Sequence, residues 1–157
     1  MVFEETESAK GPVFSYASQL TIVDVNVENG EVKVPKVVFA ADAGNILNPL
    51  AFEGQVEGGV MHGLGFALKE KFVPGETVTL KSLNIPLIKD TPDEIITVSA
   101  CVPVDGGPFG AKGAGEMSDV APVPSIINGI VSACGVRVLD LPASPDRVKG
   151  LLGKETP

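Results

Sequence analysis

Four glycines surround one lysine in the stretch GPFGAKGAGE, which begins at Gly107 and ends on Glu116. Glycine loses more backbone entropy on folding than any other residue, so a cluster of this density indicates that something approaches the main chain closely. Backbone N–H groups in such a loop can point at an anion or at the polar edge of a ring. A carboxylate held beside them can act as a general base.

The two charged residues of this stretch each allow two interpretations. Lys112 can add positive charge beside a bound anion, or it can be a solvated loop lysine. Glu116 can be a general base for a polar ligand, or a solvated acid near a helix start, where negative charge is mildly favourable. Spacing alone leaves both alternatives open for each residue.

Other common catalytic patterns are missing from the sequence. There is no G-x-S-x-G, no H-E-x-x-H and no Walker pattern, because Lys112 is followed by glycine. The single histidine, His62, is interpreted as a packed or partly exposed residue without a catalytic role. Cys101 and Cys134 form no C-x-x-C pair, lie in apolar runs and are interpreted as small core residues.

Composition is that of a soluble globular domain. The 157 residues are enough for one domain with a sizeable core, and 44% of them are hydrophobic. The formal net charge of -8 argues against a nucleic-acid or anionic-membrane surface, which requires clustered basic residues. No apolar run reaches the roughly 18 residues of a membrane span, and the acidic N-terminus does not resemble a signal peptide. We therefore expect a cytoplasmic protein without nucleic-acid or membrane partners.

Hydrophobic periodicity predicts the strands that position these residues. Alternation in FSYASQLTIVDVNV predicts a strand, and Asn29-Gly30 predicts a hairpin turn. VKVPKVVFAAD predicts the returning strand, in which Pro35 indicates an edge or a bulge. IITVSACVPV predicts a third strand, and residues 71–94 are predicted to be loop and short extended pieces.

Three segments predict helices. The first starts at Asn48-Pro49, a cap and a first residue, and continues to Leu68; the alternative is a start after Gly54, with a loop before it. VAPVPSIINGIVSACG predicts the second, with Gly135 as its C-cap, so that Glu116 lies in a loop or at the extreme start of this helix. ASPDRVKGLL, with Ser144 as N-cap, predicts a short terminal helix.

These elements together predict an α+β fold: a two-layer domain with a mixed β-sheet and helices packed on one face. Residues 1–12 are predicted to be a loose N-terminal segment, and residues 13–157 form the domain.

The first predicted helix has an unusual glycine pattern. Gly54/Gly58 and Gly59/Gly63 are spaced four residues apart, so each pair shares a helix face. Each glycine costs roughly 1 kcal/mol against alanine within a helix. The two interpretations are tight packing against a strand and the approach of a ligand to that face. Under either, we expect a side chain at Gly58 to be strongly destabilising.

Five segments in order resemble the C-terminal part of the molybdopterin-binding region of the xanthine dehydrogenase/aldehyde oxidase family of molybdenum hydroxylases. They are AADAGNILNP, GQVEGGVMHGLGFALKE, IPLIKDTP, GPFGAKGAGE and PSIINGIVSACGVRVLDLPASPDRV. The resemblance runs from about Gly11 to Leu152, and the K-G-x-G-E core within the ordered set makes it specific. Asp42, Gly44, Asn48 and Pro49 match the family's D-x-G-x-x-x-N-P and are interpreted as structural.

The resemblance implies hydroxylation of an electron-poor carbon, in a purine-like N-heterocycle or an aldehyde, at a molybdenum centre held by molybdopterin. It implies that Glu116 is the general base. It also implies that Gln55, in G-Q-x-E-G, binds the cofactor, as do the loop residues Gly110, Lys112, Gly113 and Gly115. No residue of the chain is expected to ligate the metal directly.

The chain also departs from the family. Complete molybdenum subunits are several times longer, and this chain has no cysteine clusters for the iron–sulfur centres that the family uses for electron transfer. The expected partners are therefore the remainder of the molybdenum subunit and electron-transfer subunits or domains that carry iron–sulfur clusters and, in some members, FAD. The isolated chain is expected to be inactive. The alternative is a non-catalytic structural or assembly module, or a piece of a split subunit.

Overall fold

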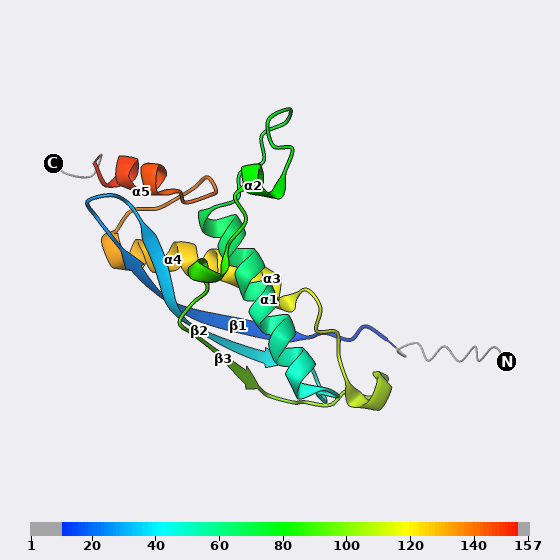
Figure 1. Cartoon of the computed structure of the whole chain (residues 1–157). Coiled ribbons are helices and arrows are strands. Elements are labelled where there is room, and N and C mark those ends of the chain that lie inside the picture. The colour runs from blue at the N-terminus through cyan, green and yellow to red at the C-terminus, as the bar shows by residue number, and fades with distance from the viewer. Residues whose placement is uncertain (1–10, 154–157) are drawn as a thin grey trace.

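A computed structural model of the chain describes residues 11–153. In chain order its strands and helices are β1 (Tyr16–Val25), β2 (Val32–Asp42), α1 (Pro49–Leu68), α2 (Leu80–Leu83), β3 (Glu94–Ser99), α3 (Met117–Val120), α4 (Pro122–Cys134) and α5 (Pro145–Leu152) (Figure 1). Most of the predicted loose segment 1–12 lies outside the described residues, so the boundary at residue 13 stays a prediction.

The first two strands form the predicted hairpin. β1 and β2 pair antiparallel along almost their whole lengths. The turn closes with the N–H of Gly30 donating to the carbonyl of Asn26 at 2.7 Å. Gly30 has a φ of +77°, and a Cβ there would lie 2.1 Å from the carbonyl oxygen of Pro145. The turn conformation and the packing of α5 against it therefore both require glycine.

Pro35 lies at a bulge in β2. Ile22 pairs with Lys36 and Asp24 pairs with Lys33, so β2 advances by three residues where β1 advances by two. β2 is the central strand of the three-stranded sheet. Pro35, which has no N–H to donate, thus lies where the ladder is already interrupted. Of the two alternatives left open by the sequence, the bulge is correct.

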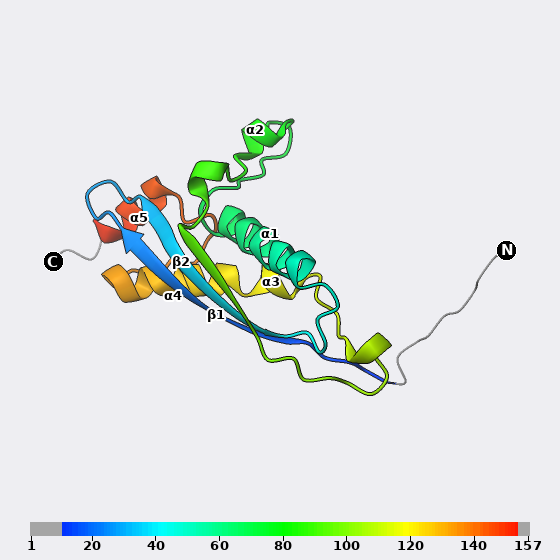
Figure 2. The same ribbon diagram turned by 60° about the horizontal axis from the view of Figure 1, so that its bottom comes forward.

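The third strand makes the sheet mixed, because β3 pairs parallel to β2. A parallel partner requires a crossover, which α1 provides. α1 and α4 cover the same face of the sheet in Figure 1, and in Figure 2 the strands pass in front of α4. The predicted two-layer α+β architecture, with helices on one face, is confirmed.

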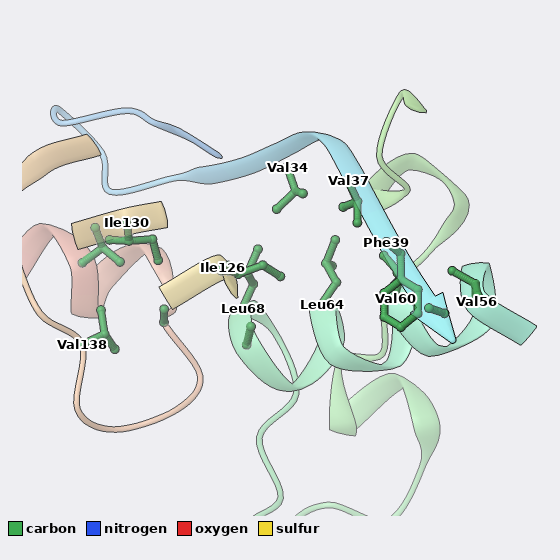
Figure 3. Close-up of a cluster of buried hydrophobic side chains, with 14 of the residues drawn as sticks. Val34, Val37, Phe39, Val56, Val60, Leu64, Leu68, Ile126, Ile130 and Val138 are labelled. Atoms are coloured by element: carbon green, nitrogen blue, oxygen red, sulfur yellow. The ribbon is translucent and has the colours of Figure 1, made fainter. Parts of the chain in front are cut away.

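α1 begins as predicted and is held by the core. The side chain of Asn48 accepts a hydrogen bond from the N–H of Ala51 at 3.1 Å, and Pro49 is the first helical residue. Inward residues of α1, β2 and α4 form one apolar cluster (Figure 3), whose fully buried members include Val37, Phe39, Val56, Val60, Ile126 and Ile130. Each such side chain contributes roughly 1.5–3 kcal/mol by burial. α1 is thereby fixed against the sheet and beside α4.

The segment after α1 has more regular structure than predicted. Residues 71–94 include the single turn α2 and a 3-10 turn at Ile88–Asp90. α2 is closed by a capping box between Thr79 and Ser82, which stabilises a helix too short to show apolar periodicity.

The third strand is shorter than predicted. β3 ends at Ser99, because Cys101 adopts a left-handed φ of +52°. The N–H of Val102 then donates to the carboxylate of Asp42 at 3.1 Å, and not to a neighbouring strand. For the same reason the expectation that Cys101 lies in the core is wrong: the residue is exposed, whereas Cys134 packs partly against the core.

The glycines of α1 divide by helix face, and the expectation for Gly58 is wrong. A Cβ on Gly59 would lie 2.5 Å from the Cβ of Ser118, and one on Gly63 would lie 2.4 Å from the Cβ of Pro122. This pair lets α3 and α4 approach α1, so the packing is helix on helix and not helix on strand. A Cβ on Gly54 or Gly58 meets nothing within 4 Å, because that face is open.

The C-terminal helices are present as predicted. Gly135 ends α4 with a φ of +80°, and α5 follows Ser144, whose side chain makes no capping hydrogen bond. The additional helix α3 directly follows Glu116. No helix within residues 11–153 has the length and apolar character needed to cross a bilayer.

Candidate cofactor-binding site

The glycine loop, defined here as residues 107–116, is held in place through its carbonyl oxygens. The carbonyl of Gly113 accepts a hydrogen bond from the hydroxyl of Ser15, which precedes β1. The carbonyl of Gly115 accepts one from Nε2 of Gln55, on α1, at 2.6 Å. The acceptor side of the loop is therefore turned toward the rest of the domain.

The donor side of the same loop remains available. The N–H groups of Gly113, Ala114 and Gly115 make no hydrogen bond to any group within residues 11–153. Ala114, Gly115 and Gln55 line a cleft of about 330 Å³, together with the β2–α1 connection. Cβ atoms on Gly113 and Gly115 would meet nothing within 4 Å, so this side of the loop is open. Free backbone donors beside an open cleft suit an anionic or oxygen-rich ligand.

Lys112 forms a buried ion pair with Asp42. Nζ of Lys112 lies 2.5 Å from Oδ2 of Asp42, and the two side chains are 7% and 14% exposed. Oδ1 of Asp42 accepts hydrogen bonds from the N–H groups of Gly44 and Val102, each at 3.1 Å. The hydrogen bond from Lys112 holds the pKa of Asp42 below its usual range; burial opposes this effect and the two backbone donors add to it.

This pairing makes Lys112 an anchor of the glycine loop. Its backbone N–H donates to the carbonyl of Ala43 at 2.8 Å, and its ammonium lies 5.9 Å from the centroid of the Tyr16 ring. The alternative of a solvated loop lysine is therefore wrong. The ammonium already has its counter-ion within the domain, so the geometry gives no support to a direct contact between this charge and a cofactor.

Both the side chain and the backbone of Gln55 make hydrogen bonds that hold it in place. Its side-chain Nε2 holds the Gly115 carbonyl, and its backbone carbonyl accepts a hydrogen bond from the hydroxyl of Ser118 at 3.1 Å. Ser118 is completely buried, in the space that Gly59 leaves between α1 and α3. The side-chain oxygen of Gln55 accepts no hydrogen bond from another residue within 11–153, so it remains available beside the cleft.

Glu116 lies at the junction between the loop and α3. Its carbonyl accepts a hydrogen bond from the N–H of Asp119 at 3.0 Å, which fixes the backbone there. The residue is exposed, and its carboxylate has no hydrogen-bond or ion-pair partner in the part of the chain that the structure describes. Glu116 does not itself line the cleft, but Gly115 does. The carboxylate without a partner therefore belongs to the residue that follows the cleft-lining Gly115 in the sequence.

His62 is 77% exposed, and its Nδ1 lies 3.7 Å from a carboxylate oxygen of Asp119. It contacts no residue of the glycine loop within hydrogen-bond distance among the described residues. Residues 11–153 also contain no group of three or more His, Cys, Asp or Glu side chains arranged to hold a metal ion. The chemistry that the site offers is therefore that of a carboxylate, an amide and backbone donors.

Sequence reasoning missed Asn45 and Ser15. Nδ2 of Asn45 donates to the carbonyl of Phe109 at 2.7 Å, and its N–H donates to the carbonyl of Gly110 at 3.1 Å. The glycine before Asn45 was a usable sequence signal, because it indicates close approach of another part of the chain. In the structure a Cβ on Gly44 would lie 2.3 Å from that Gly110 carbonyl. Ser15 carried none, because it lies 98 residues from the loop carbonyl that it holds.

Comparison with known families assigns the chain to a cofactor-binding family. A family model described as a molybdopterin cofactor-binding domain matches residues 2–92. The chain belongs to this family. The match contains the D-x-G-x-x-x-N-P segment and Gln55, and ends before the glycine loop.

Relatives of this family member are molybdenum-dependent oxidoreductases. The present chain is 40% identical over 137 residues to an aldehyde oxidoreductase of Megalodesulfovibrio gigas, and the alignment covers 87% of this chain and 15% of the relative. It is 30% identical over 141 residues to a probable xanthine dehydrogenase subunit of Bacillus subtilis, covering 87% and 19%. The crystal structure of an aldehyde oxidoreductase from Desulfovibrio desulfuricans superposes with a TM-score of 0.84 at 44% identity, covering 87% and 15%. The resemblance found in the sequence is confirmed, and the chain spans less than a fifth of each of these proteins.

Proposed function

We propose that this chain is the segment of a molybdenum hydroxylase that presents Glu116 as a general base beside a molybdopterin centre. The observation that carries the proposal is the polarity of the glycine loop. The carbonyls of Gly113 and Gly115 are held by the domain, the N–H groups of residues 113–115 are free beside a cleft, and the loop ends on a carboxylate without a partner among residues 11–153. The relatives' activities favour an aldehyde or a purine-like heterocycle as the substrate of the complete enzyme.

The residues present fit such a cofactor. The free N–H groups of Gly113 and Gly115 offer donors, and added Cβ atoms at these two residues would meet open space. The side-chain oxygen of Gln55 offers an acceptor beside the cleft. A molybdenum–pterin centre, when bound, supplies the two-electron oxidation that these side chains cannot. Electron transfer onward to iron–sulfur clusters or FAD is assigned to other parts of the complete enzyme, because the chain has only two cysteines.

Glu116 is proposed to accept a proton as the substrate is oxidised. Its carboxylate has no ion-pair or hydrogen-bond partner among residues 11–153, so it can accept the proton without first losing a partner. The hydrogen bond between its carbonyl and Asp119 fixes the backbone from which the carboxylate projects. Lys112 has a positioning role in this scheme, since it ties the loop to the end of β2.

The test compares two variants in a complete subunit. This chain would replace the 137 matched residues of the Megalodesulfovibrio gigas aldehyde oxidoreductase, to which it is 40% identical. Glu116→Gln keeps the shape of the side chain but cannot accept the proton, so we expect molybdenum content to stay unchanged and turnover to fall by about 10² to 10⁴-fold. Gln55→Ala should lower molybdenum content first, because it removes a polar group and the support of the Gly115 carbonyl.

Wild-type rates of substrate oxidation in a molybdenum-loaded Glu116→Gln chimera would show that Glu116 is not the base. In that case the glycine loop serves packing, and the non-catalytic assembly module becomes the better description of the chain.

A further inference from the structure

The outer face of the sheet is apolar, and no element within residues 11–153 covers it. Side chains alternate along the strands, so Val37 and Phe39 point toward α1 and α4 while their neighbours point away. The strand register places six apolar side chains together on the opposite side: Leu20, Ile22, Val38, Ala40, Ile96 and Val98. We call this set the outer apolar face. Leu20, Ile22 and Val98 are 61%, 46% and 48% exposed.

Sheet physics indicates that this face is covered in the assembled protein. Antiparallel sheets that face water alternate apolar and polar residues, whereas strands with parallel partners are normally buried on both faces and have continuous apolar runs. β2 reads VVFAA from residue 37 to 41 and has a parallel partner in β3. α1 and α4 cover one face, as Figures 1 and 2 show, so one cover is missing.

We propose that the outer apolar face docks against the remainder of the molybdenum subunit, through an uncharged apolar layer of that polypeptide. The inference rests on the proposed function, since it takes the chain to be a segment of such a subunit. Its argument is length: the relatives carry five times this chain's matched length or more, because the match spans only 15% to 20% of them. The net charge of -8 disfavours a second copy as the occupant.

The rim of the face fits the same occupant. At one end of the face, Lys36 and Glu94 lie opposite one another on β2 and β3 and form an ion pair of 2.7 Å. Ile22, Lys36 and Glu94 lie side by side across the three strands. Lys36 and Glu94 are the charged residues of this row, and their ion pair neutralises both charges. A partner surface that complements this face is therefore apolar opposite its centre and needs no charged residue opposite that edge.

The first experiment uses the 157-residue chain itself. Sedimentation velocity at tens of micromolar is expected to show a monomer that binds a hydrophobic dye, with dye binding reduced severalfold in Leu20→Lys/Val98→Lys. The control is Phe72→Lys/Leu139→Lys, at residues that are 68% and 83% exposed away from the sheet. Circular dichroism melts verify that both double variants fold. A stable wild-type dimer that Leu20→Lys/Val98→Lys dissociates would overturn the proposal, because the occupant would be a second copy.

The second experiment uses the chimera with the aldehyde oxidoreductase. Leu20→Lys/Val98→Lys should reduce the yield of soluble, monodisperse chimera at least tenfold, and the milder Leu20→Thr/Val98→Thr should reduce it less, while the control variant should match the unsubstituted chimera. Equal yields for all variants would overturn the docking face and leave Glu116 untouched. Failure of the unsubstituted chimera to assemble also counts against the face. A soluble chimera without molybdenum would contradict the proposed function and not the docking face.

Discussion

Asp42 gathers three donors from different parts of the chain on one carboxylate. They are the ammonium of Lys112 in the glycine loop and the N–H groups of Gly44, after β2, and Val102, after β3. Because Lys112 is almost completely excluded from water, loss of its partner leaves a buried ammonium without a counter-ion. A single carboxylate thus couples the loop that carries Glu116 to two strand ends.

We expect Asp42→Asn to release the glycine loop. The amide can still accept the two backbone hydrogen bonds but cannot neutralise Lys112, so the melting temperature should fall and the lysine should leave the ring of Tyr16. The chain has one tyrosine and no tryptophan, so intrinsic fluorescence comes from Tyr16, beside which the ammonium lies. Asp24→Asn, at an exposed position on β1, is the matched control. Unchanged Tyr16 emission in Asp42→Asn would show that the ion pair does not hold the loop.

The same pair predicts a dependence on acid. The pKa of Asp42 is lower in the folded protein than the ordinary value of 3.8, so the unfolded state binds more protons as the pH falls through this range. The stabilisation is complete above the unfolded pKa and is lost as the pH falls through the folded pKa. We expect denaturant unfolding between pH 5 and roughly 2 to show a shallower loss of stability in Asp42→Asn than in the wild type. Parallel curves for the two proteins would contradict this assignment.

At the scale of elements, adjacent glycines on α1 have opposite roles. Gly59 faces Ser118 on α3, whereas Gly58 faces open space. We expect Gly58→Ala to stabilise the protein by about 0.5–1 kcal/mol through helix propensity, which is roughly 1–4 °C in melting temperature. Gly59→Ala should destabilise it by roughly 1–3 kcal/mol, because the added methyl overlaps Ser118. Thermal melts of the two variants check the pair; equal shifts would mean that α3 does not pack where the structure places it.

Sequence patterns within a few residues predicted the helices and strands, whereas contacts between residues distant in the sequence could not be predicted. The limits of β2 and α1 follow from alternation and from the Asn48-Pro49 start, which act within a few residues. The orientation of α1 toward α3 depends on tertiary packing, so the sequence showed that Gly58 and Gly59 are unusual without showing which of them is packed. β3 ended early because the conformation of Cys101 is set by the Asp42 site and not by its own apolar run.

The candidate site shows the same division. The loop and Glu116 were found from composition and resemblance, since glycines and a carboxylate cluster within ten residues. The partners of Lys112 and of the Gly115 carbonyl could not be found this way, because they lie 70 and 60 residues away. Pairing of Lys112 with Asp42 replaces a cofactor-binding role by a positioning one in our proposal.

At the scale of the whole molecule, the chain has its own core, whereas our proposal gives it only part of an active site. We expect the isolated 157-residue chain to fold cooperatively and to show no hydroxylase turnover, because it spans only 15% of the aldehyde oxidoreductase that it matches. Purine and aldehyde oxidation, measured with an artificial electron acceptor alongside molybdenum analysis, checks this expectation. Robust turnover by the chain alone would show that the site is complete within 157 residues.

The long-range hydrogen bonds and the ion pair of the glycine loop also influence the order in which parts of the chain can fold. They join residues 98, 70 and 60 positions apart in the sequence, and loops of such length close only at an entropic cost that local structure does not carry. During synthesis the N-terminal part emerges first, so Ser15, Asp42 and Gln55 leave the ribosome well before Glu116 does. The hairpin and α1 can therefore already be formed when Glu116, our proposed base, leaves the ribosome, whereas α4 and α5 emerge after it.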